Sequence, residues 1–149
     1  MNVPQTWFIT GANRGLGRAL TVAALDAGHA VFATVRGEHS LPESERLHVH
    51  TLDVRIRDDA RQAVARAVDR FGRLDVFVNN AGYGLIGAIE EVTEEEARAI
   101  MDTDLFGPVW LSQAAVPVMR EQGSGHIVQI STVGAVGTMP TLGLYNAAK

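Results

Sequence analysis

Short runs of apolar residues are separated along the chain by longer segments whose apolar residues recur at every third or fourth position. The short runs end at glycine, asparagine or polar residues, which is typical of buried strands. They predict strands over residues 6–10, 30–35, 47–54, 74–78 and 126–131.

The longer segments predict helices. Residues 15–27 carry an apolar stripe that ends at Gly28, and residues 56–71 carry apolar residues on one face and charges on the other. Strands that alternate with helices form right-handed βαβ units. The pattern therefore predicts a single α/β domain over residues 1–149, with a Rossmann-like, doubly wound parallel sheet covered by helices on both faces.

Two further helices are predicted in the second half of the chain. Thr93 and Glu96 form a capping box, so a helix begins there. Residues 105–121 are apolar on nearly all sides, which favours either a core helix or a subunit interface. We expect Pro117 to bend or stop this helix.

Composition narrows the possible partners. The chain has 13 Lys and Arg against 17 Asp and Glu, and its net charge of −4 argues against nucleic-acid binding. It has no cysteine, which excludes disulfide scaffolds, cysteine zinc sites and thiol catalysis. Its apolar runs are too short to span a bilayer, and its N-terminus lacks a signal-peptide pattern. We therefore expect a cytoplasmic protein with no membrane partner.

His48 and His50 alternate on one face of the third predicted strand, where they could suggest a metal site. A third ligand at a convincing spacing is missing. The sequence favours surface histidines here and predicts no metal.

A glycine-rich turn, Thr10–Gly17, connects the first strand to the first helix. Gly11 permits a tight turn, Gly15 permits close approach of a pyrophosphate, and Gly17 lets the helix pack against the sheet. The N–H groups at the helix start attract phosphate. A glycine turn without a ligand is the alternative, but its place between strand and helix favours nucleotide binding.

The glycine spacing is followed by Asn79-Asn80-Ala81-Gly82, a hydroxyl residue after the fifth strand, and Tyr145 and Lys149 four positions apart. With these motifs in this order, the sequence from Thr6 to Lys149 resembles the short-chain dehydrogenase/reductase family. The resemblance implies an oxidoreductase that interconverts a secondary or primary alcohol and its ketone or aldehyde, with a nicotinamide cofactor. A non-catalytic dinucleotide-binding module or an inactive fragment of such an enzyme is the alternative.

The end of the second strand indicates which cofactor is preferred. An acidic residue there would hold the 2′-hydroxyl of NAD, but the sequence has Thr34-Val35-Arg36. Arg36 and Arg14 could pair with a 2′-phosphate, so we expect NADP(H), with NAD(H) possible. By resemblance, Asp53 and Val54 would border the adenine. The expected cofactor-binding residues are Gly11, Asn13, Arg14, Gly15, Leu16, Gly17, Arg36, Asp53, Val54, Asn80, Ala81, Gly82, Tyr145 and Lys149.

Tyr145 and Lys149 share one helical face, where an ammonium stabilises a phenolate. In the family, this tyrosine is the general acid/base, the lysine also binds the nicotinamide ribose, and a serine thirteen positions before the tyrosine polarises the carbonyl. Thr132 stands at that position here. An asparagine of the family's proton relay corresponds to Asp104. A carboxylate cannot donate the amide's hydrogen bond, so we expect Asp104→Asn to increase turnover.

The family's fold continues beyond this lysine, so we expect a sheet truncated after the fifth strand, with that strand at an edge. A terminal helix of about one turn is marginal, and Tyr145 and Lys149 would then be frayed. We expect a longer protein to reduce carbonyls with NADPH and the 149-residue chain not to. The resemblance also implies a small-molecule alcohol or carbonyl substrate and a homo-oligomer.

Overall fold

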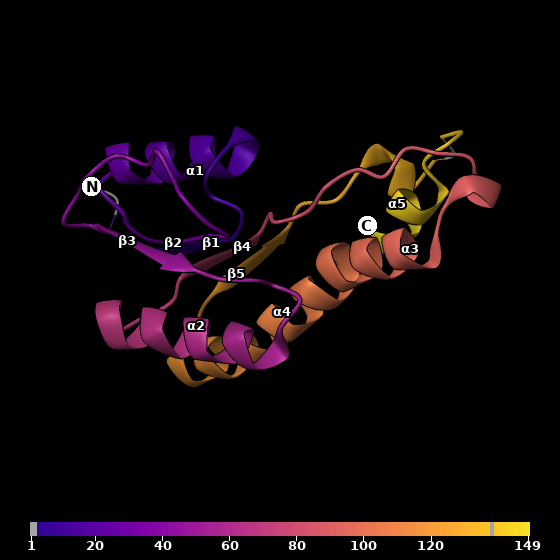
Figure 1. Cartoon of the computed structure of the whole chain (residues 1–149). Helices are drawn as coiled ribbons and strands as arrows, with labels where there is room; N and C mark the ends of the chain where they lie inside the picture. The colour runs from indigo at the N-terminus through magenta and orange to yellow at the C-terminus, as the bar shows by residue number, and fades with distance from the viewer. Residues whose placement is uncertain (1–2, 138) are drawn as a thin grey trace.

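Five short parallel strands form one sheet in the order β3-β2-β1-β4-β5 (Figure 1). The computed structural model describes residues 3–137 and 139–149. The strands are β1 (Thr6–Ile9), β2 (Ala30–Val35), β3 (Leu47–Thr51), β4 (Val76–Asn79) and β5 (His126–Gln129). The predicted doubly wound parallel sheet is confirmed, and each strand lies within or next to its predicted range.

Helices cover both faces of the sheet. They are α1 (Gly15–Asp26), α2 (Arg57–Phe71), α3 (Glu94–Met101), α4 (Gly107–Gln122) and α5 (Gly143–Ala148). Short 3-10 turns, η1 (Ile89–Glu91) and η3 (Val133–Ala135), precede α3 and α5 respectively. None of the described helices is both long and apolar enough to cross a bilayer.

The two faces have separate hydrophobic cores. On one face, Phe8 stacks between Phe32 and Phe77, with ring centroids 5.2 and 4.5 Å apart, and α2 and α4 pack over them. On the other face, α1 covers Val31 and Ala33 (Figure 1). This two-sided burial explains why the central strands are nearly continuous apolar runs rather than alternating ones.

The capping box at Thr93 and Glu96 is confirmed: the Thr93 N–H donates to Glu96 Oε2 over 3.0 Å, and the Glu96 N–H donates to Thr93 Oγ1 over 3.2 Å. Helices α3 and α4 are joined by a π-helical segment, η2 (Asp102–Phe106), and form one continuous helical run. Sequence periodicity predicted two separate helices, because a single π-turn leaves no mark in the apolar pattern.

Pro117, which we expected to bend or stop this helix, does not stop it, because α4 continues to Gln122. Pro117 and Gln113 are both exposed. The Gln113 carbonyl, which the proline leaves without an N–H donor, can therefore bind water. Meanwhile Leu111 and Ala115 stay buried against the sheet and hold the helix in place.

Candidate functional site

A cavity of about 740 Å³ lies along the carboxyl ends of β1 to β4. The chain leaves β1 toward β2 on one side, while β4 pairs with β1 on the other, so the cavity is at the switch point where open α/β sheets bind ligands. Eleven of the residues expected to bind a cofactor line it: Gly11, Asn13, Arg14, Gly15, Leu16, Arg36, Asp53, Val54, Asn80, Ala81 and Gly82.

The glycine turn has a backbone that other residues would strain. Gly11 and Gly15 have φ values of +64° and +54°, in the left-handed region. A Cβ on Gly17 would lie 2.5 Å from Asn80 Nδ2 and closer still to the Gly11 carbonyl oxygen. Gly17 is therefore outside the cavity lining and sets how closely α1 approaches the turn.

Asn80 holds the end of β4 against this turn. Its Nδ2 donates to the Thr10 carbonyl over 2.8 Å, and its backbone N–H donates to Thr10 Oγ1 over 2.9 Å. The Ala81 N–H donates to the same hydroxyl oxygen over 2.9 Å, and that hydroxyl donates to the Val78 carbonyl. The side chain of Asn80 is thus used to shape the cavity.

Asn13 ties the turn to the segment that follows β2. Its Nδ2 donates to the Glu38 carbonyl over 2.8 Å, and its Oδ1 accepts from the Ser40 N–H over 3.3 Å. Arg36, Gly37 and Glu38 of that segment line the cavity. Asn13 therefore fixes the position of the rim that carries Arg36.

The far end of the cavity leads to Asp104 and Lys149. Lys149 Nζ lies 3.4 Å from Asp104 Oδ2 and donates to the Ile130 carbonyl over 3.2 Å. A Cβ on Gly82 would lie 2.7 Å from that Nζ and 3.1 Å from both Asp104 carboxylate oxygens. A residue larger than glycine at position 82 would therefore have to displace the Lys149 ammonium from its position beside Asp104.

Asp104 is almost fully buried, although its side chain lies beside the Lys149 ammonium. Burial raises the pKa of the Asp104 carboxyl, and the Lys149 ammonium and the Tyr83 N–H, which donates to Oδ1 over 3.2 Å, offset this only in part. The Asp104 carboxylate therefore pairs with the same ammonium group that is expected to stabilise the Tyr145 phenolate.

Tyr83 lines the cavity, and sequence reasoning did not assign it to the site. Burial raises the pKa of its phenol, and the Asp104 charge raises it further. Its position directly after the Asn-Asn-Ala-Gly segment was the available signal.

Tyr145 and Lys149 lie one turn apart in and just after α5, where the Lys149 N–H donates to the Tyr145 carbonyl over 3.2 Å. Ser131 Oγ donates to the Lys149 carbonyl over 3.0 Å, which ties the end of the chain to the segment after β5. The backbone N–H and the carbonyl of Lys149 are therefore both hydrogen-bonded, while the expected fraying of this turn stays a prediction. Thr132 Oγ1 accepts from the Gly134 N–H, so its own O–H is left to donate.

His48 and His50 both pack on Phe32, with ring centroids 4.9 and 5.5 Å away. Burial lowers the pKa of each histidine, and Arg66 lowers both further. Over residues 3–137 and 139–149, the structure contains no group of three acidic, histidine or cysteine side chains placed to hold a metal ion.

Comparison with known proteins gives one consistent result. Residues 5–149 match the family model described as short chain dehydrogenase. The oxidoreductase BOA17 of Botryotinia fuckeliana is 40% identical over 151 residues, which cover 97% of this chain and 55% of the relative. The chain thus spans about half the length of the curated relatives it matches.

Solved structures agree. A short-chain dehydrogenase from Streptomyces avermitilis superposes with a TM-score of 0.94 at 38% identity, covering 100% of this chain and 57% of that one. An alcohol dehydrogenase from Thermococcus sibiricus, solved with 5-hydroxy-NADP, superposes with a TM-score of 0.88 at 25% identity, covering 98% and 66%.

Proposed function

The chain belongs to the short-chain dehydrogenase/reductase family, and from this premise we propose that it is an NADP(H)-dependent oxidoreductase that interconverts a secondary or primary alcohol and its ketone or aldehyde. The observation that carries the proposal is the continuity of the site. The cavity runs from Arg36 at one rim to Gly82, and Gly82 lies against Lys149.

The residues of the cavity fit a dinucleotide phosphate. The glycine turn presents backbone that a side chain would block, and the start of α1 favours a pyrophosphate. Arg14 and Arg36 are exposed at the rim for a 2′-phosphate, and Asp53 and Val54 would border the adenine. When bound, the nicotinamide ring donates or accepts a hydride.

The chain's own residues would handle the proton. Tyr145 would donate a proton to the carbonyl oxygen or take it from the alcohol, and the Lys149 ammonium would stabilise the phenolate. Thr132 would donate its O–H to the carbonyl oxygen, since the Gly134 N–H already occupies a lone pair of Oγ1. The proposed partners are a small-molecule alcohol or carbonyl compound and a second copy of the chain, the latter contacting α4.

The cofactor assignment predicts that the chain binds NADPH at least about tenfold more tightly than NADH, because Arg36 stands directly after β2, where an acid would hold the ribose of NAD, and Arg14 of the glycine turn lines the same cavity. Fluorescence titration with both nucleotides measures this ratio. Tighter binding of NADH would contradict the assignment.

A panel of ketones and aldehydes with NADPH then tests catalysis. Tight binding of NADPH without oxidation in the presence of any carbonyl would favour the second candidate, a non-catalytic dinucleotide-binding module. The observation that favours this candidate is the ion pair between Asp104 and Lys149, which engages the ammonium that Tyr145 requires.

Asp104→Asn is expected to increase turnover and to stabilise the fold at neutral pH. The amide removes a buried negative charge that competes for Lys149, and it keeps an oxygen for the Tyr83 N–H. Because burial raises the pKa of Asp104 in the folded state above its unfolded value, ionisation of Asp104 destabilises the fold, and this penalty declines as the pH falls from the folded-state pKa to the unfolded-state one. Thermal melting as a function of pH should show the full stabilisation above the folded-state pKa and its decline as the pH falls toward the ordinary pKa of a carboxyl group.

Asp102→Asn is the matched control, since Asp102 is exposed in the same π-helical segment. It should change the free energy of unfolding by less than about 0.5 kcal/mol. Equal gains for both variants would mean that net charge, and not the buried carboxylate, sets the effect.

A further inference from the structure

Asp53 lies on the cavity rim, where it is hydrogen-bonded to Arg55 and follows β3, the strand that pairs with β2 just before Arg36. Its carboxylate follows β3, lines the cavity, and is about one quarter exposed, at 26% of its side chain. Arg55 and Arg36 both lower the pKa of this carboxyl, Arg55 through its hydrogen bonds and Arg36 by its charge alone. The two cations therefore act on the same carboxylate.

Arg55 is hydrogen-bonded to that carboxylate through its side chain and its backbone. Its Nη2 donates to Asp53 Oδ2 over 2.6 Å, its Nε donates to Oδ1 over 3.0 Å, and its backbone N–H donates to Oδ1 over 3.0 Å. This is the two-pronged contact that gives an arginine–carboxylate pair its fixed geometry. Arg55 thereby balances the negative charge of Asp53 and holds its carboxylate in one orientation.

Arg36 is left available. It is exposed at the rim, and the ion pairs among the residues that the structure describes do not include it. Its segment is also held in place from the other side, where Asn13 binds the Glu38 carbonyl and the Ser40 N–H. Without Arg55, the Asp53 carboxylate would be left to pair with Arg36 or to repel an anion bound beside Arg36.

We propose that Arg55 is a specificity-determining residue: by engaging Asp53, it keeps Arg36 free to bind the 2′-phosphate of NADP(H). This inference rests on the proposed function and adds a positioning role for a residue outside the cavity lining. Without Arg55, the Asp53 carboxylate would pair with Arg36 or repel the 2′-phosphate. Either effect weakens the binding of NADPH and leaves the binding of NADH unchanged, because NADH lacks the 2′-phosphate.

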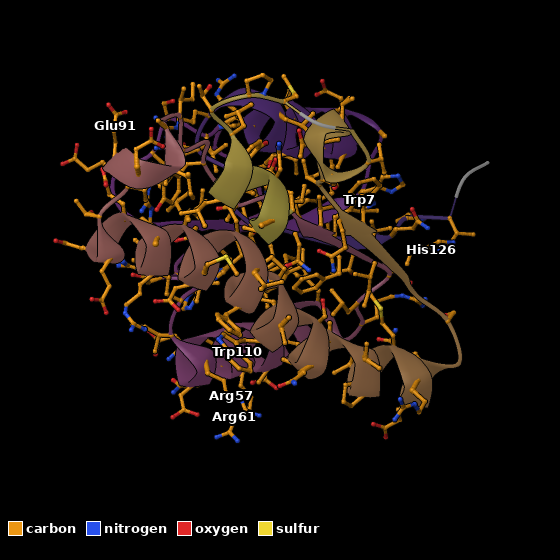
Figure 2. All side chains as sticks on the ribbon, turned by 90° about the vertical axis from the view of Figure 1, so that its right-hand side faces the viewer. Trp7, Arg57, Arg61, Glu91, Trp110 and His126 are labelled. Atoms are coloured by element: carbon orange, nitrogen blue, oxygen red, sulfur yellow. The ribbon has the colours of Figure 1, made fainter. Side chains whose placement is uncertain are left out.

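The test is the ratio of the dissociation constants for NADH and NADPH, measured by fluorescence titration. Arg55→Gln should lower this ratio about tenfold, mainly by weakening NADPH. Arg61→Gln removes the same charge from α2, where the Arg61 side chain is 78% exposed and points away from the molecule (Figure 2), and it should leave the ratio within about twofold.

The double variant Asp53→Asn with Arg55→Gln separates this role from general loss of charge or of folding. With residue 53 neutral, its side chain no longer competes with the 2′-phosphate for Arg36, so the ratio should return to within about threefold of that of the unaltered chain. Failure of the double variant to restore the ratio, or equal weakening of NADH and NADPH by Arg55→Gln, would overturn the inference. An unaltered chain that binds neither nucleotide would overturn the proposed function itself.

Discussion

Gly17→Ala is expected to destabilise the fold by about 3 kcal/mol, which for a chain of this length lowers the melting temperature by roughly 9 °C. The added methyl group would lie 2.5 Å from Asn80 Nδ2, 3.0 Å from the Gly11 carbonyl carbon, and against the Gly11 carbonyl oxygen. These neighbours cannot yield cheaply, because Gly11 contributes backbone and Asn80 Nδ2 is hydrogen-bonded to the Thr10 carbonyl over 2.8 Å. Thermal melting and urea titration measure the loss.

The same substitution is expected to weaken NADPH binding at least about tenfold, since relief of the collision moves the glycine turn away from the end of β4. Gly84→Ala is the matched control: Gly84 is exposed, and a Cβ there would meet no atom within 4 Å. It should change stability by less than about 0.5 kcal/mol and leave NADPH affinity unchanged. A Gly17→Ala chain that melts like the unaltered one would contradict the packing of α1 on the turn.

Much of this site could be predicted from the sequence, because the features that build it are local. A strand, a glycine turn and a helix follow one another within residues 6–26, and their order alone places Gly11 and Gly15 at the carboxyl end of β1. The edge position of β5 within the described residues also matches the expectation drawn from the family's longer fold. Periodicity reports burial, and burial determines where strands and helices form.

The ion pair between Asp104 and Lys149 could not be predicted from the sequence, because it depends on the π-helical segment η2. A π-turn changes which face each later residue occupies, so the helical register counted from Thr93 does not place Asp104. The resemblance matched Asp104 to a relay position, but only the fold shows that its carboxylate binds the ammonium directly.

The role proposed for Arg55 could not be predicted from the sequence, for a different reason. In the sequence, Asp53 is expected to border the adenine, but Arg55 looks like an ordinary charge just before a surface helix, and pairs of such charges usually contribute little. What distinguishes them is the geometry of the contact and the position of Arg36 across the rim, both of which require β2 and β3 to lie side by side.

Tyr145→Phe is expected to lower the rate of carbonyl reduction by about a thousandfold, the scale of a lost general acid. The measurement is made on the polypeptide that shows turnover, whether the 149-residue chain or a longer one that contains it. Phenylalanine keeps the ring and removes only the hydroxyl, so NADPH affinity should stay within about threefold and serves as the internal control.

A Tyr145→Phe variant that keeps more than about a tenth of the rate would place the proton donor elsewhere. Tyr83 is then the first residue to test, since it is the other of the two tyrosines in the sequence and lines the cavity proposed to hold the cofactor. We expect it not to substitute. Burial and the Asp104 charge raise its pKa, so its phenol holds its proton more firmly and cannot easily act as the base for an alcohol. We therefore expect the proton transfer to depend on Tyr145, with the proposed stabilising cation, Lys149, one helical turn away along the backbone.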